Sequence, residues 1–402
     1  MKRYVWDVIA VGVGVTVGVL MYPTDAAWWL VALAIAAFAF APRFQLVGPG
    51  GSQLDLVLLI GAAVPFLFPT PNGTVAVLAL GIAGLRAARA SGATPDVPLP
   101  VDVRRVIGAL AYASVLYLSG IPLQLDQGLA AVWLWLAAAL AWFTVEVFFR
   151  LLAITRTEAT SLAYVVGVGL RDLPLIGSLM AAGAAFGLVW QVSDPWVAVV
   201  VGAVPFHITF SSFRRYGATR VTYGQTILAL ARIPEVGGLA LEGHAERTGR
   251  LAVAIGKEIG LRPDRVQLLE YAALMHDIGR ITLTEPSVVE AGYTEDDISR
   301  WSAEIIAEAD YLTEAARIVR IHHEPYRRPG EEDDPDLPIE ARIVKVASAF
   351  DRAVHEAGAS PLEALELLHR GSVYDYDPRV VRSLRIVLEH VPDLAGAVAH
   401  SR

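Results

Sequence analysis

Long apolar stretches with few charges fill the chain up to about residue 213, and they constrain its fold more than any other feature. Because the hydrocarbon core of a bilayer is spanned by a helix of roughly 20 apolar residues, such stretches predict membrane-spanning helices. We expect about eight of them in an integral membrane domain, residues 1–213. The expected spans are residues 4–22, 26–41, 53–69, 73–88, 105–120, 128–149, 173–191 and 196–212.

The arginines between these stretches predict how the spans are oriented. They fall on alternate loops, whereas the intervening loops, such as "PTPNG" and "SGIPLQLDQG", hold no Lys or Arg. By the positive-inside rule both termini then lie in the cytoplasm, which agrees with an even number of spans. The sequence therefore predicts a multi-pass protein of the inner (cytoplasmic) membrane, with lipid as a partner.

Two segments of the apolar half resemble each other. "VGPGGSQLDLVLLIGAAV" (47–64) is similar to "VGVGLRDLPLIGSLMAAG" (166–183), and each is followed by a polar turn and a further span. This suggests a duplicated four-span unit, a feature of transporters and of membrane sensor domains. A transporter with a regulatory cytoplasmic domain is therefore one alternative. No span is clearly broken by paired Gly and Pro around a midplane charge, which weighs against it.

The second half of the chain is charged and has the spacing of helices. Residues 214–236 predict a linker helix, through which we expect the chain to form a homodimer. In residues 237–402 apolar positions recur every three or four residues, breaks carry Gly, Pro or Asp, and nothing alternates like a strand. The predicted fold is all-α: a polytopic helical membrane domain followed by a cytoplasmic all-helical bundle.

Composition limits the chemistry that this bundle can perform. The chain has no Cys, so disulfides and thiolate metal sites are excluded, and any metal must bind to His and carboxylate ligands. The net charge is −8 and there is no basic tract, so nothing indicates a nucleic-acid partner.

The most informative polar residues are histidines on or near the ends of predicted helices: His244, the pair His276-Asp277 and the pair His322-His323. The pair His276-Asp277 follows "YAALM", whose spacing directs it into the bundle. Burying a charged aspartate without a partner is costly, so we expect a metal or a strong ion pair against it. A divalent metal of the Mn, Fe, Mg or Ni type would suit these ligands and the hydrolysis of a phosphoester.

Residues from about 222 to 392 resemble the HD superfamily of metal-dependent phosphohydrolases, and within it the HD-GYP branch. The similarity is carried in order by "GHAERTGRLA", "YAALMHDIGRI", "IVRIHHE", "EARIVKVASAFDRAV" and "EALELLHRGSVYDYDP". It implies a helical bundle that holds two or three metals, and cyclic di-GMP as the nucleotide hydrolysed. By position, the resemblance implies metal ligands at His244, His276, Asp277, His322 and His323.

The resemblance also implies roles for two further residues. Arg280 stands where the family usually has Lys and keeps a cation that can hold a phosphate, so we expect Asp277 and Arg280 to act in catalysis. Asp351 matches the second Asp of the family's late helix and is a predicted metal ligand. We expect His355, His369, His390 and His400 to be ordinary satisfied or surface histidines.

Three departures from the family leave a second interpretation open. Residues 281–321 contain no His where the family has another ligand, and Asp296, Asp297 and Glu304 are the acids nearby. Ser348 aligns with a ligand Asp, and "HHEPYRRPGEEDDPDLP" lacks the Gly-Tyr-Pro signature. The alternative to a phosphodiesterase is thus a catalytically degenerate signalling module that binds a nucleotide or a partner protein without turnover.

Overall fold

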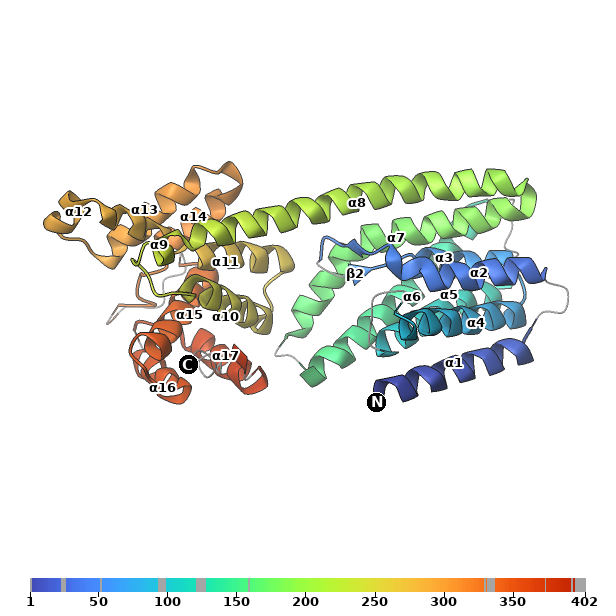
Figure 1. The fold of residues 1–402 in the computed structure, drawn as a ribbon, viewed down its shortest axis with the longest axis horizontal. Helices are drawn as coiled ribbons and strands as arrows, with labels where there is room; N and C mark the ends of the chain where they lie inside the picture. The colour runs from blue at the N-terminus through green and yellow to red at the C-terminus, as the bar shows by residue number, and fades with distance from the viewer. Residues whose placement is uncertain are drawn as a thin grey trace. The chain divides into compact units, whose positions relative to one another are not determined.

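The all-α fold class is confirmed by the computed structural model (Figure 1). Over the part of the chain that it describes, the only strands are those of one short hairpin. The structure describes residues 2–22, 27–50, 53–92, 99–120, 128–157, 160–328, 330, 337–372, 374–391 and 393–394. The chain divides into two compact units, the first formed by residues 1–151 and 168–218 and the second by residues 152–167 and 219–402.

Each expected span overlaps a helix, although the span 53–69 begins in a short strand. The helices are α1 (Lys2–Leu20), α2 (Trp28–Phe40), α3 (Val57–Leu67), α4 (Pro71–Ala90), α5 (Leu99–Leu118), α6 (Gly128–Thr157), α7 (Leu162–Val192) and α8 (Pro195–Ala231). A short 3-10 helix, η1 (Ala41–Arg43), follows α2, and β1 (Leu46–Val47) pairs antiparallel with β2 (Gln53–Leu54). The start of α4 is defined by Thr70, whose side chain accepts the Gly73 N–H, and by Pro71 in the first turn.

Among the described residues, four helical segments are long and apolar enough to cross a membrane by length and composition: Pro71–Ala90, Ala130–Leu152, Leu162–Val192 and Pro195–Val236. Shorter apolar helical segments are Asp7–Leu20, Trp28–Arg43 and Val57–Leu67. The count of about eight spans stays a prediction. The duplication of a four-span unit also stays a prediction. Residues 47–64 include most of the hairpin and most of α3, whereas residues 166–183 lie wholly within α7.

Small residues let the helices of the first unit pack closely. Gly61 and Gly108 leave room for the indole of Trp142, and Gly81 leaves room for the ring of Phe38. Both aromatic side chains are buried, and Trp142 is 0% exposed. Such close packing at small residues is how helices associate where apolar burial alone cannot drive them together.

Charged side chains pair inside the first unit. Asp102 of α5 is 0% exposed and accepts from Arg86 of α4 at 2.8 Å, and it also pairs with Arg89. Arg105 lies 2.7 Å from the carboxylate of Asp55. Because an unpaired charge is costly in an apolar bundle, these pairs tie α3, α4 and α5 to one another.

Two further contacts of charged side chains join the hairpin to α7 and α6 to α5. The backbone N–H of Gly50, which follows β1, donates to Asp172 Oδ1 of α7 at 2.8 Å, so Gly50 packs against a buried carboxylate. On α6, Glu146 lies 2.7 Å from Arg104 Nε. The charges of the first unit are therefore structural partners of one another.

The second unit is a bundle of amphipathic helices. They are α9 (Ile233–Val236), α10 (His244–Ile259), α11 (Pro263–Met275), α12 (Pro286–Ala291), α13 (Glu295–Ala307), α14 (Thr313–Arg320), α15 (Ile339–His355), α16 (Pro361–Gly371) and α17 (Pro378–His390), with the 3-10 turns η3 (Ile278–Thr284) and η4 (Asp310–Leu312). Its core is built from Ile255, Leu269, Val319, Val344 and Leu384, each 0% exposed. The buried faces follow from apolar residues at three- and four-residue spacing.

The predicted domain bounds, residues 1–213, 214–236 and 237–402, stay a prediction, and the two compact units divide the chain at other residues. The predicted linker helix, residues 214–236, is the end of α8 followed by α9. Residues 152–167 group with the second unit, and there the Ser161 N–H donates to the Lys257 carbonyl at 3.0 Å. Gly260 has φ +93° and no Cβ, which leaves room for the Ser161 side chain.

Candidate metal centre

The first candidate ligand, His244, is set by a capped helix start. Gly243 adopts φ 74°, a left-handed conformation that suits glycine, and α10 begins at His244. The Glu235 carboxylate accepts the N–H groups of Gly243 and Ala245, each at 2.9 Å. This carboxylate satisfies the free N–H groups of the first turn and so holds His244 in place.

Three side chains converge at one point of the second unit. His276 follows the last residue of α11, and Asp277 precedes η3. His244 Nε2 lies 3.3 Å from His276 Nε2 and 3.8 Å from Asp277 Oδ2, and His276 Nε2 lies 3.7 Å from Asp277 Oδ1. One ligand atom from each residue lies within 4.8 Å of the others, and all three residues are buried. Residue types and spacing fit a divalent cation.

The hydrogen bonds behind the imidazoles direct their Nε2 atoms into this cluster. His244 Nδ1 lies 2.7 Å from Asp351 Oδ2, and His276 Nδ1 lies 2.8 Å from the Ala273 carbonyl. Both partners accept only, so each Nδ1 carries a hydrogen. With neutral rings, two Nε2 lone pairs then face each other beside a carboxylate. The Ser348 hydroxyl, 3.1 and 3.4 Å from these nitrogens, can donate to one of them at a time. A cation at this point satisfies all of these acceptors.

Burial favours the neutral form of His276 and His322. It lowers the pKa of His276 to about 3, and it lowers the pKa of His322 well below its usual value. Neutral imidazole is the form that binds a metal.

The buried carboxylate of Asp277 has two cationic partners. Its carboxylate lies 2.9 Å from Arg280 Nε and 3.0 Å from Arg352 Nη2. Burial by itself raises the pKa of this carboxyl, but His276, Arg352 and Arg280 outweigh burial and lower the pKa well below its usual range. The expected strong ion pair is thus present, and it comes from two arginines.

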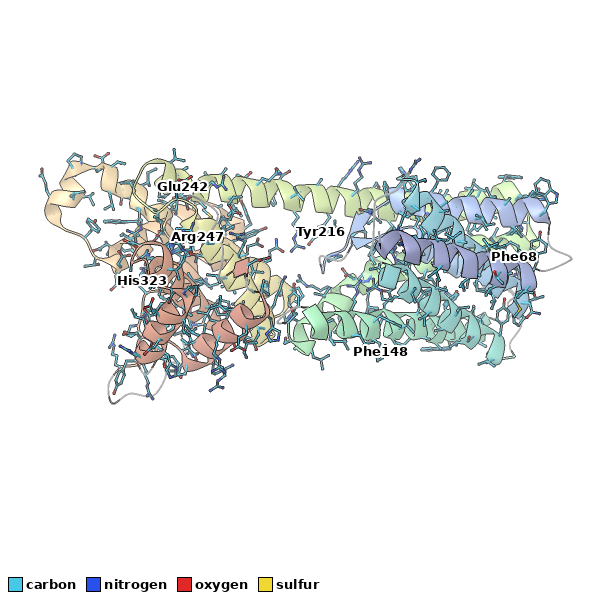
Figure 2. All side chains as sticks on the ribbon, turned by 60° about the horizontal axis from the view of Figure 1, so that its bottom comes forward. Phe68, Phe148, Tyr216, Glu242, Arg247 and His323 are labelled. Atoms are coloured by element: carbon cyan, nitrogen blue, oxygen red, sulfur yellow. The ribbon has the colours of Figure 1, made fainter. Side chains whose placement is uncertain are left out.

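The pair His322-His323 lies next to the cluster. His322 Nδ1 lies 2.6 Å from the Val319 carbonyl, and its ring centre is 5.4 Å from that of His276. Its Nε2 is buried and has no hydrogen-bond partner among the described residues. His323 Nε2 lies 3.6 Å from Glu295 Oε2 (His323 is labelled in Figure 2). Their role as ligands stays a prediction.

Asp351 lies behind His244. Its carboxylate accepts from Arg247 Nε at 2.6 Å and from Arg247 Nη2 at 3.0 Å, in addition to His244 (Arg247 is labelled in Figure 2). The structure therefore gives Asp351 contacts that orient a ligand, and direct metal binding by Asp351 stays a prediction. Ser348, one turn earlier on α15, is the residue of this helix that touches both imidazoles.

Three residues at the site were missed from the sequence: Arg247, Arg352 and Glu295. Arg247 lies three positions after His244, and Arg352 is next to Asp351, so proximity to candidate ligands was the available signal. Glu295 opens α13 and had no such signal. The nearby acids considered instead do not reach the site. Asp297 forms the capping box with Thr294, and Asp296 and Glu304 are exposed.

A cavity of about 300 Å³ adjoins the cluster. It is lined by His244, Asp277, Arg280, Glu295, Arg352 and Glu356, together with residues 238–241. Its charged wall includes the two arginines that pair with Asp277, so an anion entering it would arrive beside the candidate metal ligands.

We predict that Asp351→Asn lowers metal affinity by about 10- to 100-fold, because residues that orient a ligand imidazole have effects of this size. The amide can rotate its NH₂ toward Arg247 or His244 and weakens the hydrogen bond to Nδ1. Titration of the full-length protein with Mn²⁺ measures the change. His355→Ala, which removes a side chain 3.2 Å from the other Asp351 oxygen, serves as the matched control. Unchanged affinity in Asp351→Asn would contradict this role.

The part of the chain that holds this site is similar to proteins of a known family. Residues 241–353 match the family model described as HD domain. The chain is 30% identical over 177 residues to the cyclic di-GMP phosphodiesterase response regulator RpfG of Xanthomonas campestris pv. campestris (strain 8004), which covers 40% of this chain and 47% of that protein.

Two further relatives carry the name cyclic di-GMP phosphodiesterase. One, from Thermotoga maritima, is 28% identical over 167 residues, 38% of this chain and 45% of the relative. The other, from Vibrio cholerae serotype O1, is 22% identical over 206 residues, 44% and 42% of the two chains. The chain spans less than half the length of these relatives. With the His/Asp cluster, these findings support an HD-type, metal-dependent phosphohydrolase.

Proposed function

We propose that this protein is a membrane-anchored, metal-dependent phosphodiesterase that hydrolyses a cyclic dinucleotide, with cyclic di-GMP as the expected substrate. The observation that carries the proposal is the convergence of His244 Nε2, His276 Nε2 and the Asp277 carboxylate in a buried cluster beside a charged cavity. The names of three relatives that match this part of the chain support the substrate.

In this proposal His244, His276 and Asp277 hold a divalent cation of the Mn, Fe, Mg or Ni type. Such a cation lowers the pKa of a bound water and polarises a phosphoryl oxygen. Asp351 and the Ala273 carbonyl keep the two Nδ1 hydrogens on the far side of the rings, so that both Nε2 atoms are available. Arg280 lies at the edge of the cavity and orients the phosphate.

The first unit is proposed as the membrane anchor and sensor. Four helices have the length and composition to cross a bilayer, and their outer faces expose large apolar side chains. Trp133 is 70% exposed, Leu140 61%, Trp196 67% and Ile208 60%. A soluble protein rarely exposes such faces, whereas lipid covers them. We place the protein in the inner membrane with both termini in the cytoplasm, following the distribution of arginine between its loops.

A homodimer through residues 214–236 is also proposed. Val221 and Val236 are 58% and 88% exposed on this segment, which leaves apolar side chains for a second copy. Crosslinking in the membrane that detects only monomer would remove this part of the proposal.

The second candidate function is a receiver that binds a nucleotide or a partner protein without turnover. A specific observation favours it. Ser348 contacts both imidazoles from the position where the family has a ligand carboxylate, and two arginines already neutralise Asp277. A site with fewer anionic ligands binds a metal less tightly.

The test uses the full-length protein in detergent, supplied with Mn²⁺ or Fe²⁺ and cyclic di-GMP, with release of the linear dinucleotide measured by chromatography. Asp277→Asn is compared with Asp310→Asn, an exposed aspartate of η4. We expect turnover in the wild type and in Asp310→Asn, and its loss in Asp277→Asn. Binding of cyclic di-GMP without turnover in any protein would favour the receiver instead.

A further inference from the structure

Glu295 contacts Arg280 and Arg352, the two arginines that pair with Asp277. Its Oε2 atom lies 2.9 Å from Arg280 Nη2 and 3.6 Å from Arg352 Nη1. The same oxygen lies 3.6 Å from His323 Nε2. The Glu295 side chain is 45% exposed and lines the cavity, whereas those of Arg280 and Arg352 are 13% and 26% exposed. A half-exposed carboxylate thus covers two more deeply placed guanidinium groups.

The two arginines are shared between two carboxylates. On one side each pairs with Asp277, and on the other side each faces Glu295. The Asp277 side chain is only 8% exposed and belongs to the candidate metal cluster, so its position is set by the bundle. Glu295 lies on the first turn of α13. Of the two carboxylates, it is the one that can move away from the arginines without exposing a buried carboxylate.

The position of Glu295 is one that a phosphate would take. Guanidinium groups donate in a planar fork that matches carboxylate and phosphate oxygens alike. An anion that reaches the cluster through the cavity meets Arg280 and Arg352 next to Asp277. It can engage both guanidinium groups only if the Glu295 carboxylate moves away.

We propose that Arg352 joins Arg280, whose phosphate contact belongs to the proposed function, in a two-arginine phosphate-binding subsite, and that Glu295 occupies this subsite as a built-in competitor of the incoming phosphate. The ligand class is a phosphate monoanion or dianion, and its assignment to the substrate's phosphodiester rests on the proposed function. Arg352 and Glu295 then act on phosphate binding, and neither belongs to the candidate metal cluster.

The test measures binding of inorganic phosphate to the full-length protein in detergent by calorimetry. Glu295→Gln is expected to bind phosphate about 5- to 10-fold more tightly than the wild type, because it removes one charge about 4 Å from the anion. Glu356→Gln removes an exposed charge from the same cavity and is the matched control, with a change of less than about 2-fold expected. Arg352→Met is expected to weaken phosphate binding about 10-fold, and Arg352→Lys to restore part of it.

Two further measurements complete the test. Metal content is expected to be the same in Glu295→Gln as in the wild type. With cyclic di-GMP, Glu295→Gln is expected to lower KM with little change in kcat. Unchanged or weaker phosphate binding in Glu295→Gln overturns the proposal, and so does loss of metal from this variant, which would make Glu295 a ligand.

The outcomes separate the two proposals. Tighter phosphate binding by Glu295→Gln without turnover in any protein supports the subsite and contradicts the phosphodiesterase. Turnover with no change of phosphate affinity in Glu295→Gln supports the phosphodiesterase and contradicts the subsite.

Discussion

His276→Ala is expected to lower turnover of cyclic di-GMP by more than about 100-fold, because residues that only orient metal ligands already contribute 10- to 100-fold to metal affinity or activity. His276 is 0% exposed, and its Nε2 faces both His244 and Asp277. The substitution removes one of three converging ligand atoms. It should also abolish the rise in melting temperature that added Mn²⁺ gives the wild type, because a ligand stabilises a fold only by binding to it.

The control for this prediction is His369→Ala, which removes an exposed imidazole from α16. His276→Gln is included because it keeps a polar side chain at a fully buried position, in case the alanine variant does not fold. If either folded His276 variant keeps the wild-type response to Mn²⁺ and the wild-type turnover, the cluster is not the metal site.

Asp102→Asn is expected to destabilise the first unit by about 3–5 kcal/mol, the usual effect of breaking a buried ion pair on one side. Asp102 is 0% exposed and pairs with both Arg86 and Arg89 of α4. Asparagine is nearly the same size but carries no charge, so two buried guanidinium groups lose their shared counter-charge. Thermal unfolding in detergent should show an apparent Tm lower by on the order of 10 °C.

Asp194→Asn is the matched control in the same unit. Asp194 is exposed and immediately precedes α8, a position where asparagine is as favourable as aspartate. We expect its Tm to equal that of the wild type. An Asp102→Asn protein as stable as this control would show that the buried pairs of α4 and α5 contribute little to stability.

The regular part of the fold was predictable from local patterns. Apolar residues in long runs or at helical spacing were sufficient to locate the eight segments of the first unit and the helices of the second. The pair His276-Asp277 was predictable for the same reason, because the helical spacing of "YAALM" directs it into the core. Ser348 was noted from the family resemblance as standing in place of a ligand Asp, and it contacts both imidazoles from α15.

The contacts made by long side chains were not predictable in this way. Arg352 and Arg280 meet Asp277 and Glu295 only because α13, α15 and η3 come together in space. No spacing along the chain indicates this. Likewise, the hydrogen bonds of Asp351 to Arg247 and to His244 Nδ1 were not predicted, and its role as a metal ligand stays a prediction.

The grouping of residues 152–167 with the second unit was also not predictable from the sequence. Residues 152–167 fall within the predicted membrane domain, residues 1–213. They group with the second unit, where a backbone hydrogen bond joins Ser161 to Lys257, and composition carries no information about such a bond.

The central claim is that His244, His276 and Asp277 bind one divalent cation, and its most direct test is metal content. The full-length protein and its His244→Ala and His276→Ala variants are loaded with Mn²⁺, passed through gel filtration and analysed for manganese per chain. We predict at least about one ion per wild-type chain and a loss of that ion in both variants. A wild-type protein that retains no metal, or variants that retain as much as the wild type, would contradict the account.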